Sequence, residues 1–287
     1  MNERDTEHVH REFTAANVEP DQPVDTVHAM ESSLIDPLVD PRRLVELEAV
    51  HNFRDLGGYP ARDGSVTRWH QLYRADGLYR LTAADIETVR ALGLRTVVDL
   101  RSNAEIDKWG TFPCQAIKVN FTHHPVIDQT WELDSQADRT DHEFLVWAYQ
   151  QMLQVGWQRF ATAIEELAQP GALPAVFHCA AGKDRTGLLA AMVLESLGVP
   201  RTVVLADYEL TVEGIVRMRS WVELNHPEMA VRMAETPSAF LMALPAALGD
   251  VLDGLAQQHG TIDAYVRSIG VSAAALQSLA DQLLVNP

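Results

Sequence analysis

One short run of residues constrains this chain more than any other: positions 178–187 read HCAAGKDRTG. An apolar run at 175–177 leads into a histidine and a cysteine, five residues separate that cysteine from an arginine, and a helix-forming run follows at 188–197. This order predicts a strand, a tight loop and the N-terminus of a helix. The backbone N–H groups of such a loop point inward, and with the helix dipole they form a site for an anion.

Three side chains of this run carry the chemistry expected of such a site. Cys179 is expected at its bottom, where fixed dipoles and a nearby guanidinium favour the thiolate over the thiol. Arg185 offers a planar fork for two phosphate oxygens, and Lys183 adds a second positive charge at the rim. The alternative is an ordinary buried cysteine in a strand–helix turn, with Arg185 on the surface. The loop residues expected to contact the anion are Ala180, Ala181, Gly182, Lys183 and Thr186.

The run resembles the Cys-x5-Arg signature of the protein tyrosine phosphatase superfamily. Its Lys-Asp pair before the arginine is similar to the atypical bacterial branch of PtpB-like phosphatases. Four other stretches agree with that branch: NFRDLGG at 52–58, YRAD at 73–76, VDLRS at 98–102 and DYELT at 207–211. The resemblance covers residues 45–215 or so. It implies a tyrosine-phosphatase-like α/β fold, with a central, mainly parallel sheet flanked by helices.

The resemblance implies hydrolysis of a phosphomonoester in two steps. The Cys179 thiolate attacks phosphorus and displaces the alcohol or phenol, and water then hydrolyses the cysteinyl-phosphate. Backbone amides of residues 180–185 and the Arg185 guanidinium hold the oxygens of the transferred group. The Thr186 hydroxyl is expected to donate to the Cys179 sulfur or to cap the following helix, and His178 to order the loop through its ring nitrogens.

The leaving oxygen needs a proton unless it belongs to a good phenolate leaving group. Classical tyrosine phosphatases supply it from an aspartate in a Trp-Pro-Asp loop, and this sequence contains no Trp-Pro-Asp. Asp184 is the first candidate, because it lies within the loop as in the resembling branch. Asp99, at the end of a predicted strand, and Asp128, on a polar loop, are the alternative acids. Asp99 is equally expected to pair with Lys183 or Arg101.

The expected substrates are phosphotyrosine and also phosphoserine, phosphothreonine or phosphoinositides, because a further cation at Lys183 suits multiply charged groups. The expected partners are therefore a phosphorylated protein or a phosphoinositide, and no cofactor is expected. Two other functions fit parts of the sequence. A rhodanese-like sulfurtransferase also uses a cysteine loop, although a shorter one, and a phosphate-binding module without turnover would need the same loop.

The composition excludes several classes of partner. The net charge is −17, and lysine occurs only at positions 108, 118 and 183, so nucleic-acid binding is not expected. No apolar run is long enough to span a bilayer, and no apolar signal segment is visible. We therefore expect a cytoplasmic protein, or one exported without a visible signal; the oligomeric state is open.

The cysteines and histidines exclude two kinds of structural site. Cys114 and Cys179 are the only cysteines, too few for a disulfide framework. Cys114 is expected to be a plain loop or core residue, or a thiol that protects the reactive one. The pair His123-His124 lacks the spacing of a metal site, so no metal is expected.

The chain is expected to divide at residue 44. Residues 1–44 are acidic and contain prolines, which indicates a largely irregular extension with a short helix near 24–34, either a tail or a partner-binding arm. The phosphatase domain is then 45–287. Within it, residues 212–248 are rich in methionine and leucine, which indicates either ordinary helical core or a mobile lid over the site. Arg54 and Asp55 are expected to form a structural ion pair or turn.

Alternating strand and helix signals predict one α/β domain with four or five mainly parallel strands and a C-terminal helical portion. Strands are expected at 69–74, 95–100, 116–121 and 175–178, with a polar loop at 121–141. One helix is expected to begin after Thr82, with Asp85 in a capping-box position. Further helices are expected at 141–167, 186–197 and 201–210, followed by several helices up to the C-terminus.

Overall fold

The computed structural model describes residues 38–127 and 138–286. Its strands are β1 Arg54–Asp55, β2 Val66–Thr67, β3 Leu72–Ala75, β4 Thr96–Asp99, β5 Asn120–His123, β6 Ala175–His178 and β7 Leu284–Val285. Its helices are η1 Leu78–Arg80 (a 3-10 turn), α1 Ala83–Ala91, α2 Asn103–Trp109, α3 Asp141–Leu167, α4 Asp184–Ser196, α5 Arg201–Glu209, α6 Thr211–Asn225, α7 Pro227–Ala234, α8 Ser238–Leu241, α9 Pro245–His259, α10 Ile262–Ser268 and α11 Ala273–Leu283. The helix expected near 24–34 and the candidate acid Asp128 lie outside the described residues.

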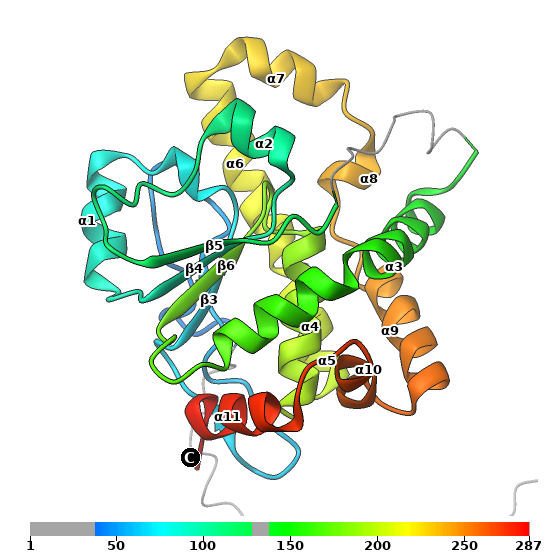
Figure 1. The fold of residues 1–287 in the computed structure, drawn as a ribbon. Coiled ribbons are helices and arrows are strands. Elements are labelled where there is room, and N and C mark those ends of the chain that lie inside the picture. Colours follow the sequence, from blue (N-terminus) through cyan, green and yellow to red (C-terminus); the bar gives the residue numbers. More distant parts are fainter. Residues whose placement is uncertain (1–37, 128–137, 287) are drawn as a thin grey trace, which may run out of the picture. The chain divides into compact units, whose positions relative to one another are not determined.

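The central sheet has five strands in the order β1-β3-β6-β4-β5 (Figure 1). The pairs β3·β6, β6·β4 and β4·β5 are parallel, and β1 runs antiparallel to β3. This confirms the predicted α/β fold with a mainly parallel sheet. His178 pairs with both Ala75 and Asp99, so the three central strands end level with one another. The loop that starts at Cys179 therefore leaves the sheet at its carboxyl edge, where sites gather in such folds.

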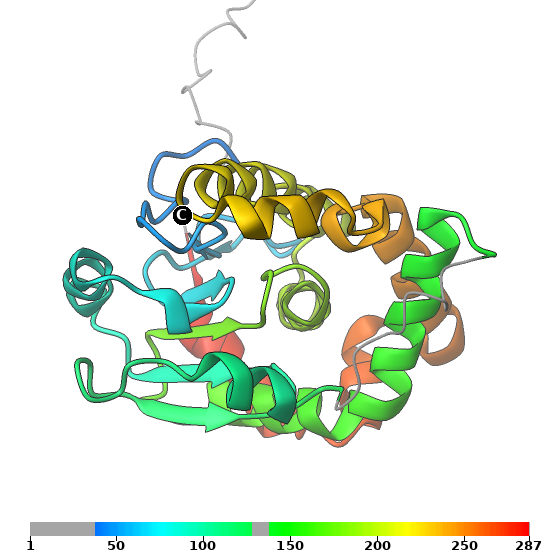
Figure 2. The same ribbon diagram turned by 90° about the horizontal axis from the view of Figure 1, so that it is seen from above.

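Side chains of the central strands alternate between two apolar layers. On one face, Val97 and Val176 pack in a cluster with Val89 of α1. On the other face, Val98 and Phe177 belong to a larger cluster that includes α3 and α4. Helices thus cover both faces, as predicted, and α1 and α4 lie on opposite sides of the strands in both views (Figures 1 and 2).

Three helices begin with the same capping box. A Ser or Thr hydroxyl accepts the backbone N–H three residues on, and the acidic side chain at that position accepts the backbone N–H of the Ser or Thr. α1 begins after Thr82 with Asp85 as its partner, as predicted. α3 has the predicted range, 141–167. Helix α2 was not predicted, although Ser102 and Glu105 form the same box.

Two strands differ from their predicted ranges. β3 begins after His70, which adopts a φ of 62° and donates its N–H to Asp55, so extended backbone cannot start at position 69. β5 begins at 120 rather than 116, because residues 114–117 form a turn whose N–H groups at 116 and 117 both donate to the Pro113 carbonyl.

The C-terminal helices pack on the α3–α4 side of the sheet. α9 contacts α3 and α5, and α10 contacts α4. The segment predicted as core or lid, 212–248, contains most of α6, all of α7 and α8, and the start of α9. It is only partly core, because Val222 and Ala239 are buried whereas Val216 and Val231 are exposed. Among the described helices, none is long and apolar enough to cross a membrane.

Residues 38–44, assigned above to the N-terminal extension, contact the sheet. The buried Arg43 guanidinium donates to the backbone carbonyls of Asp55 and Gly57, and Leu44 bridges to Arg54. The short stretch before residue 45 is therefore anchored to β1. The boundary at residue 44 stays a prediction.

Candidate active site

Cys179 follows β6 directly, and its side chain is 2% exposed. The loop after it turns sharply at Gly182, which has a φ of +64°. A Cβ at this position would lie 2.6 Å from the carbonyl oxygen of Ala75, closer than any side chain tolerates. Only glycine lets the loop close against the end of β3, so the motif requires glycine at position 182 for steric reasons.

The carbonyl groups of the loop point away from its centre. Those of residues 180–182 accept hydrogen bonds from outside the loop: Gly77 N–H at 3.1 Å, Asn52 Nδ2 at 3.0 and 3.1 Å, and Arg74 Nη2 at 2.8 Å. Because each peptide unit is planar and trans, the N–H groups of residues 181–183 point the opposite way, into the loop. No acceptor among the described residues receives them. The result is a ring of backbone donors, the arrangement that holds anions in other folds.

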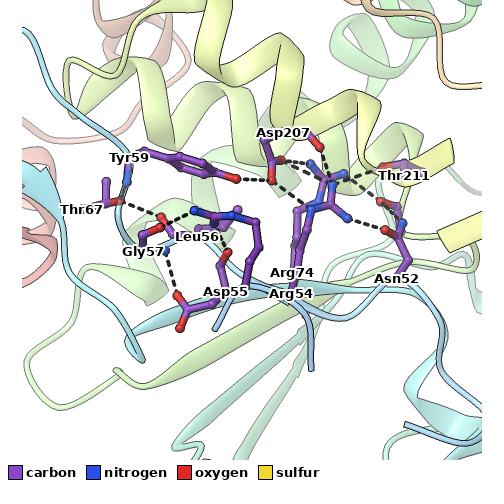
Figure 3. Close-up of polar contacts among 12 residues, drawn as sticks. Asn52, Arg54, Asp55, Leu56, Gly57, Tyr59, Thr67, Arg74, Asp207 and Thr211 are labelled. Carbon is purple, nitrogen blue, oxygen red and sulfur yellow. Dashed lines mark hydrogen bonds and ion pairs between the residues drawn. The ribbon is translucent and has the colours of Figure 1, made fainter. Parts of the chain in front are cut away.

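A buried ion cluster outside the loop holds these donors in place (Figure 3). Asp207 accepts from Arg54 Nε at 2.9 Å, from Arg74 Nη1 at 2.6 Å and from the Tyr59 hydroxyl at 2.8 Å. Burial raises the pKa of Asp207, but the two guanidinium groups outweigh it and hold that pKa well below its usual value. The carboxylate therefore stays ionised and fixes Arg74, the donor to the loop.

Arg54 accordingly forms a structural ion pair, and its Nη1 also donates to the Asn52 side chain. Asp55 accepts from Gly57 N–H at 2.7 Å and from His70 N–H at 2.7 Å, which makes it a turn residue. These contacts match the structural roles expected for Arg54 and Asp55. They also show that the family-like stretches at 52–58, 73–76 and 207–211 meet in one cluster behind the loop.

Arg185 is held by a two-pronged ion pair with Glu105 of α2. Its Nη1 lies 2.5 Å from Oε2 and its Nη2 2.9 Å from Oε1. Burial lowers the pKa of Arg185, but the neighbouring Cys179 and Glu105 more than compensate and leave that pKa above its usual value. The guanidinium therefore stays charged, and only 12% of the side chain is exposed, so Arg185 is not a surface residue.

Asp184 and Lys183 form a second group of contacts. Asp184 Oδ1 accepts the Tyr149 hydroxyl at 2.7 Å and lies 3.4 Å from Lys183 Nζ. Lys183 is fully buried, and its ammonium donates to the carbonyls of Ala239 at 2.7 Å and Met242 at 3.0 Å. It is thus not the exposed cation at the rim that we expected. Carbonyls at the end of α8 lack helical partners and attract the ammonium there instead.

The remaining loop side chains are buried. Thr186 Oγ1 has no hydrogen-bond partner among the described residues, and the N-cap of α4 is Lys183, so Thr186 does not cap this helix. His178 Nδ1 lies 3.3 Å from the Cys179 carbonyl oxygen. Burial lowers the pKa of His178, although Asp99 opposes this.

Asp99 forms a buried ion pair with Arg101. Its carboxylate is fully buried and accepts Arg101 Nη2 at 2.6 Å, Arg101 Nε at 3.0 Å and the Arg101 backbone N–H at 3.0 Å. Burial raises the pKa of Asp99, but His178 and Arg101 outweigh it and lower that pKa. Of the two roles expected for Asp99, the structure shows the partner of Arg101.

Residues outside the loop have separate contacts. Cys114 is exposed and, like Cys179, is a free thiol. His123 Nε2 lies 2.7 Å from the Arg101 carbonyl oxygen, and His124 Nε2 lies 2.9 Å from Glu166. The histidine pair is thus divided between two different partners.

Three residues that surround the site were not predicted as site residues. Glu105 carried a signal, because Ser102-x-x-Glu105 repeats the capping pattern used to place α1. Asn52 lay in a recognised stretch, but nothing local indicates that its amide reaches the loop. Tyr149 falls on the buried face of α3, where an aromatic residue predicts packing and not a hydrogen bond.

Comparison with known proteins shows the family of this chain. "Triple specificity protein phosphatase PtpB" of Mycobacterium tuberculosis is 28% identical over 276 residues, which cover 83% of this chain and 98% of that protein. A "Tyrosine-protein phosphatase" of Nostoc commune is 29% identical over 214 residues, 72% of this chain and 71% of that one. The crystal structure of P. aeruginosa TpbA matches 60% of this chain and 91% of its own at 19% identity, with a TM-score of 0.28. The family model described as "Tyrosine phosphatase family" matches residues 45–285, so the chain belongs to this family and is a phosphatase, a hydrolase.

Proposed function

We propose that the chain hydrolyses phosphomonoesters through a cysteinyl-phosphate formed on Cys179. The observation that carries this proposal is the ring of inward N–H groups at residues 181–183, with Arg185 beside the cysteine. Both features stabilise negative charge at the same place, first on sulfur and then on the transferred phosphoryl oxygens.

In the first step the Cys179 thiolate forms a bond to phosphorus as the ester P–O bond breaks. The Asp184 carboxyl group gives its proton to the leaving oxygen, which departs as an alcohol or phenol. In the second step the Asp184 carboxylate takes a proton from water, whose oxygen displaces sulfur and releases phosphate. The buried Thr186 hydroxyl, which has no acceptor among the described residues, is free to donate to the departing sulfur.

The substrate class that we propose is phosphotyrosine, with phosphoserine, phosphothreonine and phosphoinositides as further substrates. The name of the M. tuberculosis relative, a triple specificity phosphatase, supports a broad range. The argument from Lys183 loses force, because its ammonium is directed to carbonyls at 239 and 242 rather than to a ligand. A panel of phosphopeptides and phosphoinositides, assayed with the Cys179→Ser protein as blank, distinguishes these classes.

We also propose that residues 212–248 act as a lid over the loop. The support is the direct contact between the loop and this segment, from Lys183 to the carbonyls at 239 and 242, together with the exposed apolar residues on α6 and α7.

The direct test compares Cys179→Ser with Cys114→Ser, since both changes remove one sulfur. In the Cys179→Ser protein, kcat for p-nitrophenyl phosphate is expected to fall at least about a thousandfold, while Cys114→Ser keeps the parent kcat. Orthovanadate binding without hydrolysis of any ester would favour a phosphate-binding module. Thiosulfate:cyanide transfer in place of phosphatase activity would favour a sulfurtransferase.

A further inference from the structure

We propose that Tyr149 of α3 is a positioning residue, which holds Asp184 so that its Oδ2 oxygen carries the proton for the leaving group. This inference rests on the role of Asp184 proposed above. Nothing in the sequence of the loop names this partner, because it comes from a helix 35 positions away.

The two carboxylate oxygens of Asp184 have different surroundings. Oδ1 accepts the Tyr149 hydroxyl at 2.7 Å and lies 3.4 Å from the Lys183 ammonium. Oδ2 has no donor within the described ranges 38–127 and 138–286. A proton avoids the oxygen that already faces a hydroxyl hydrogen and a cation, so it resides on Oδ2. The Asp184 side chain keeps 27% of its surface exposed, which leaves Oδ2 access to a substrate.

The direction of the hydrogen bond is fixed by a chain of donors. A tyrosine has one hydroxyl proton, and Tyr149 gives it to Asp184, since Oδ1 only accepts when the proton of the carboxyl group is on Oδ2 or absent. The short contact between the Tyr149 and Tyr208 hydroxyls then requires Tyr208 to donate to Tyr149. The chain of hydroxyl groups runs from Tyr208 of α5, through Tyr149 of α3, to Asp184 of the loop.

Both tyrosines remain donors over the working pH range. Burial raises the pKa of Tyr149 well above its usual value, and the charge of Asp184 raises it further. Burial likewise raises the pKa of Tyr208. Neither hydroxyl ionises near neutrality, so Tyr149 presents a proton to Oδ1 throughout.

Packing fixes the two rings as well as their hydrogen bonds. Tyr149 is fully buried and Tyr208 is 1% exposed. A Cβ at Gly187 would lie 2.9 Å from the Tyr208 ring, so the last glycine of the HCAAGKDRTG run leaves the space that this ring fills. The loop motif and the DYELT stretch therefore pack against each other, with Gly187 of the first against the Tyr208 ring of the second.

The experiment compares Tyr149→Phe with Tyr265→Phe, a control that removes the hydroxyl of another mostly buried tyrosine far along the chain. The substrates are a series of aryl and alkyl phosphates with leaving groups of increasing pKa. Tyr149→Phe is expected to leave kcat/KM for p-nitrophenyl phosphate within about twofold and to lower it by about tenfold or more for an alkyl phosphate. Tyr265→Phe is expected to follow the parent across the series.

The pH profile of kcat/KM would not change if Tyr149 had only a structural role. Loss of a donor to the carboxylate favours its protonated form, so the basic limb of kcat/KM for Tyr149→Phe shifts upward by about one pH unit. If this variant does not fold, fluorotyrosine at position 149 keeps the shape and strengthens the donor, and the basic limb is then expected to move to lower pH.

The outcomes separate the two proposals. If Asp184→Asn shows the same leaving-group dependence as the parent, Asp184 is not the acid and the proposed mechanism fails with it. If Asp184→Asn steepens that dependence but Tyr149→Phe behaves like Tyr265→Phe, only the role of Tyr149 is overturned. An unchanged basic limb with fluorotyrosine at 149 overturns it too.

Discussion

Arg185 and Glu105 are joined by two parallel hydrogen bonds, of 2.5 and 2.9 Å, between the loop helix α4 and the first turn of α2. The same carboxylate accepts the Ser102 N–H at 2.8 Å and so completes the capping box of α2. Glu105 therefore links the fold of α2 to the orientation of the guanidinium. Such a two-pronged pair holds the planar guanidinium in one orientation.

Glu105→Gln tests this link. Glutamine preserves the capping box but removes the charge and one acceptor oxygen, so α2 stays folded while the Arg185 fork loosens. We expect kcat/KM for p-nitrophenyl phosphate to fall by about tenfold, through a higher KM, a lower kcat or both. This fall corresponds to about 1.4 kcal/mol of lost transition-state stabilisation. Glu87→Gln, at an exposed helical pair with Arg90, serves as the control and is expected to keep the parent kcat/KM. Equal kinetics of both variants would argue against a role for Glu105.

Asp207→Asn tests the buried cluster behind the loop. Removing the carboxylate leaves the guanidinium groups of Arg54 and Arg74 buried without their counter-charge. We expect a loss of about 3–5 kcal/mol in the free energy of unfolding, measured by urea denaturation. Asp253→Asn breaks an exposed contact with Arg201 and is expected to cost less than about 1 kcal/mol.

The same carboxylate predicts a pH dependence of stability. The pKa of Asp207 is lower in the folded protein than in the unfolded chain. Its contribution is therefore complete above the unfolded pKa of about 3.9 and is lost as the pH falls from there toward the folded pKa. Urea midpoints measured from pH 6 down to pH 3 should fall more steeply for the parent than for Asp207→Asn. Parallel curves would contradict an ionised Asp207 in the folded state.

Gly182→Ala tests the closure of the loop. The added Cβ meets the Ala75 carbonyl at 2.6 Å, whereas at Gly93, which has a similar φ of +65°, a Cβ meets nothing within 4 Å. Gly93→Ala therefore carries only the cost of left-handed backbone, about 1–2 kcal/mol. We expect Gly182→Ala to lose orthovanadate binding measured by calorimetry, while Gly93→Ala binds as the parent does. Retained binding by Gly182→Ala would show that the loop does not need this approach.

Limited proteolysis tests the proposed lid. Cleavage within 212–248 is expected to be slower with a bound phosphate analogue than without one, and Lys183→Met is expected to speed it, because the contacts to the carbonyls at 239 and 242 disappear. Lys108→Met, which alters a lysine over the Trp109 ring, is the control and is expected to leave the cleavage rate unchanged. Equal cleavage rates with and without the analogue would count against a lid.

The sequence predicted what depends on short-range patterns. The β6–loop–α4 unit and the ranges of α3 and β6 follow from apolar periodicity and turn residues. The position of Lys183 was not predictable in this way, because its partners, the carbonyls at 239 and 242, are more than fifty residues away. Tyr149 was missed for the same reason. A loop sequence specifies which groups are present, but tertiary packing decides which of them face the ligand.

Rapid quenching of the Asp184→Asn protein during turnover of p-nitrophenyl phosphate, followed by mass spectrometry of its peptides, tests the central claim most directly. A covalent phosphate on the peptide that contains Cys179, absent from the peptide that contains Cys114, is the predicted result. Full turnover with no phosphate on Cys179 at any quench time would contradict a cysteinyl-phosphate intermediate.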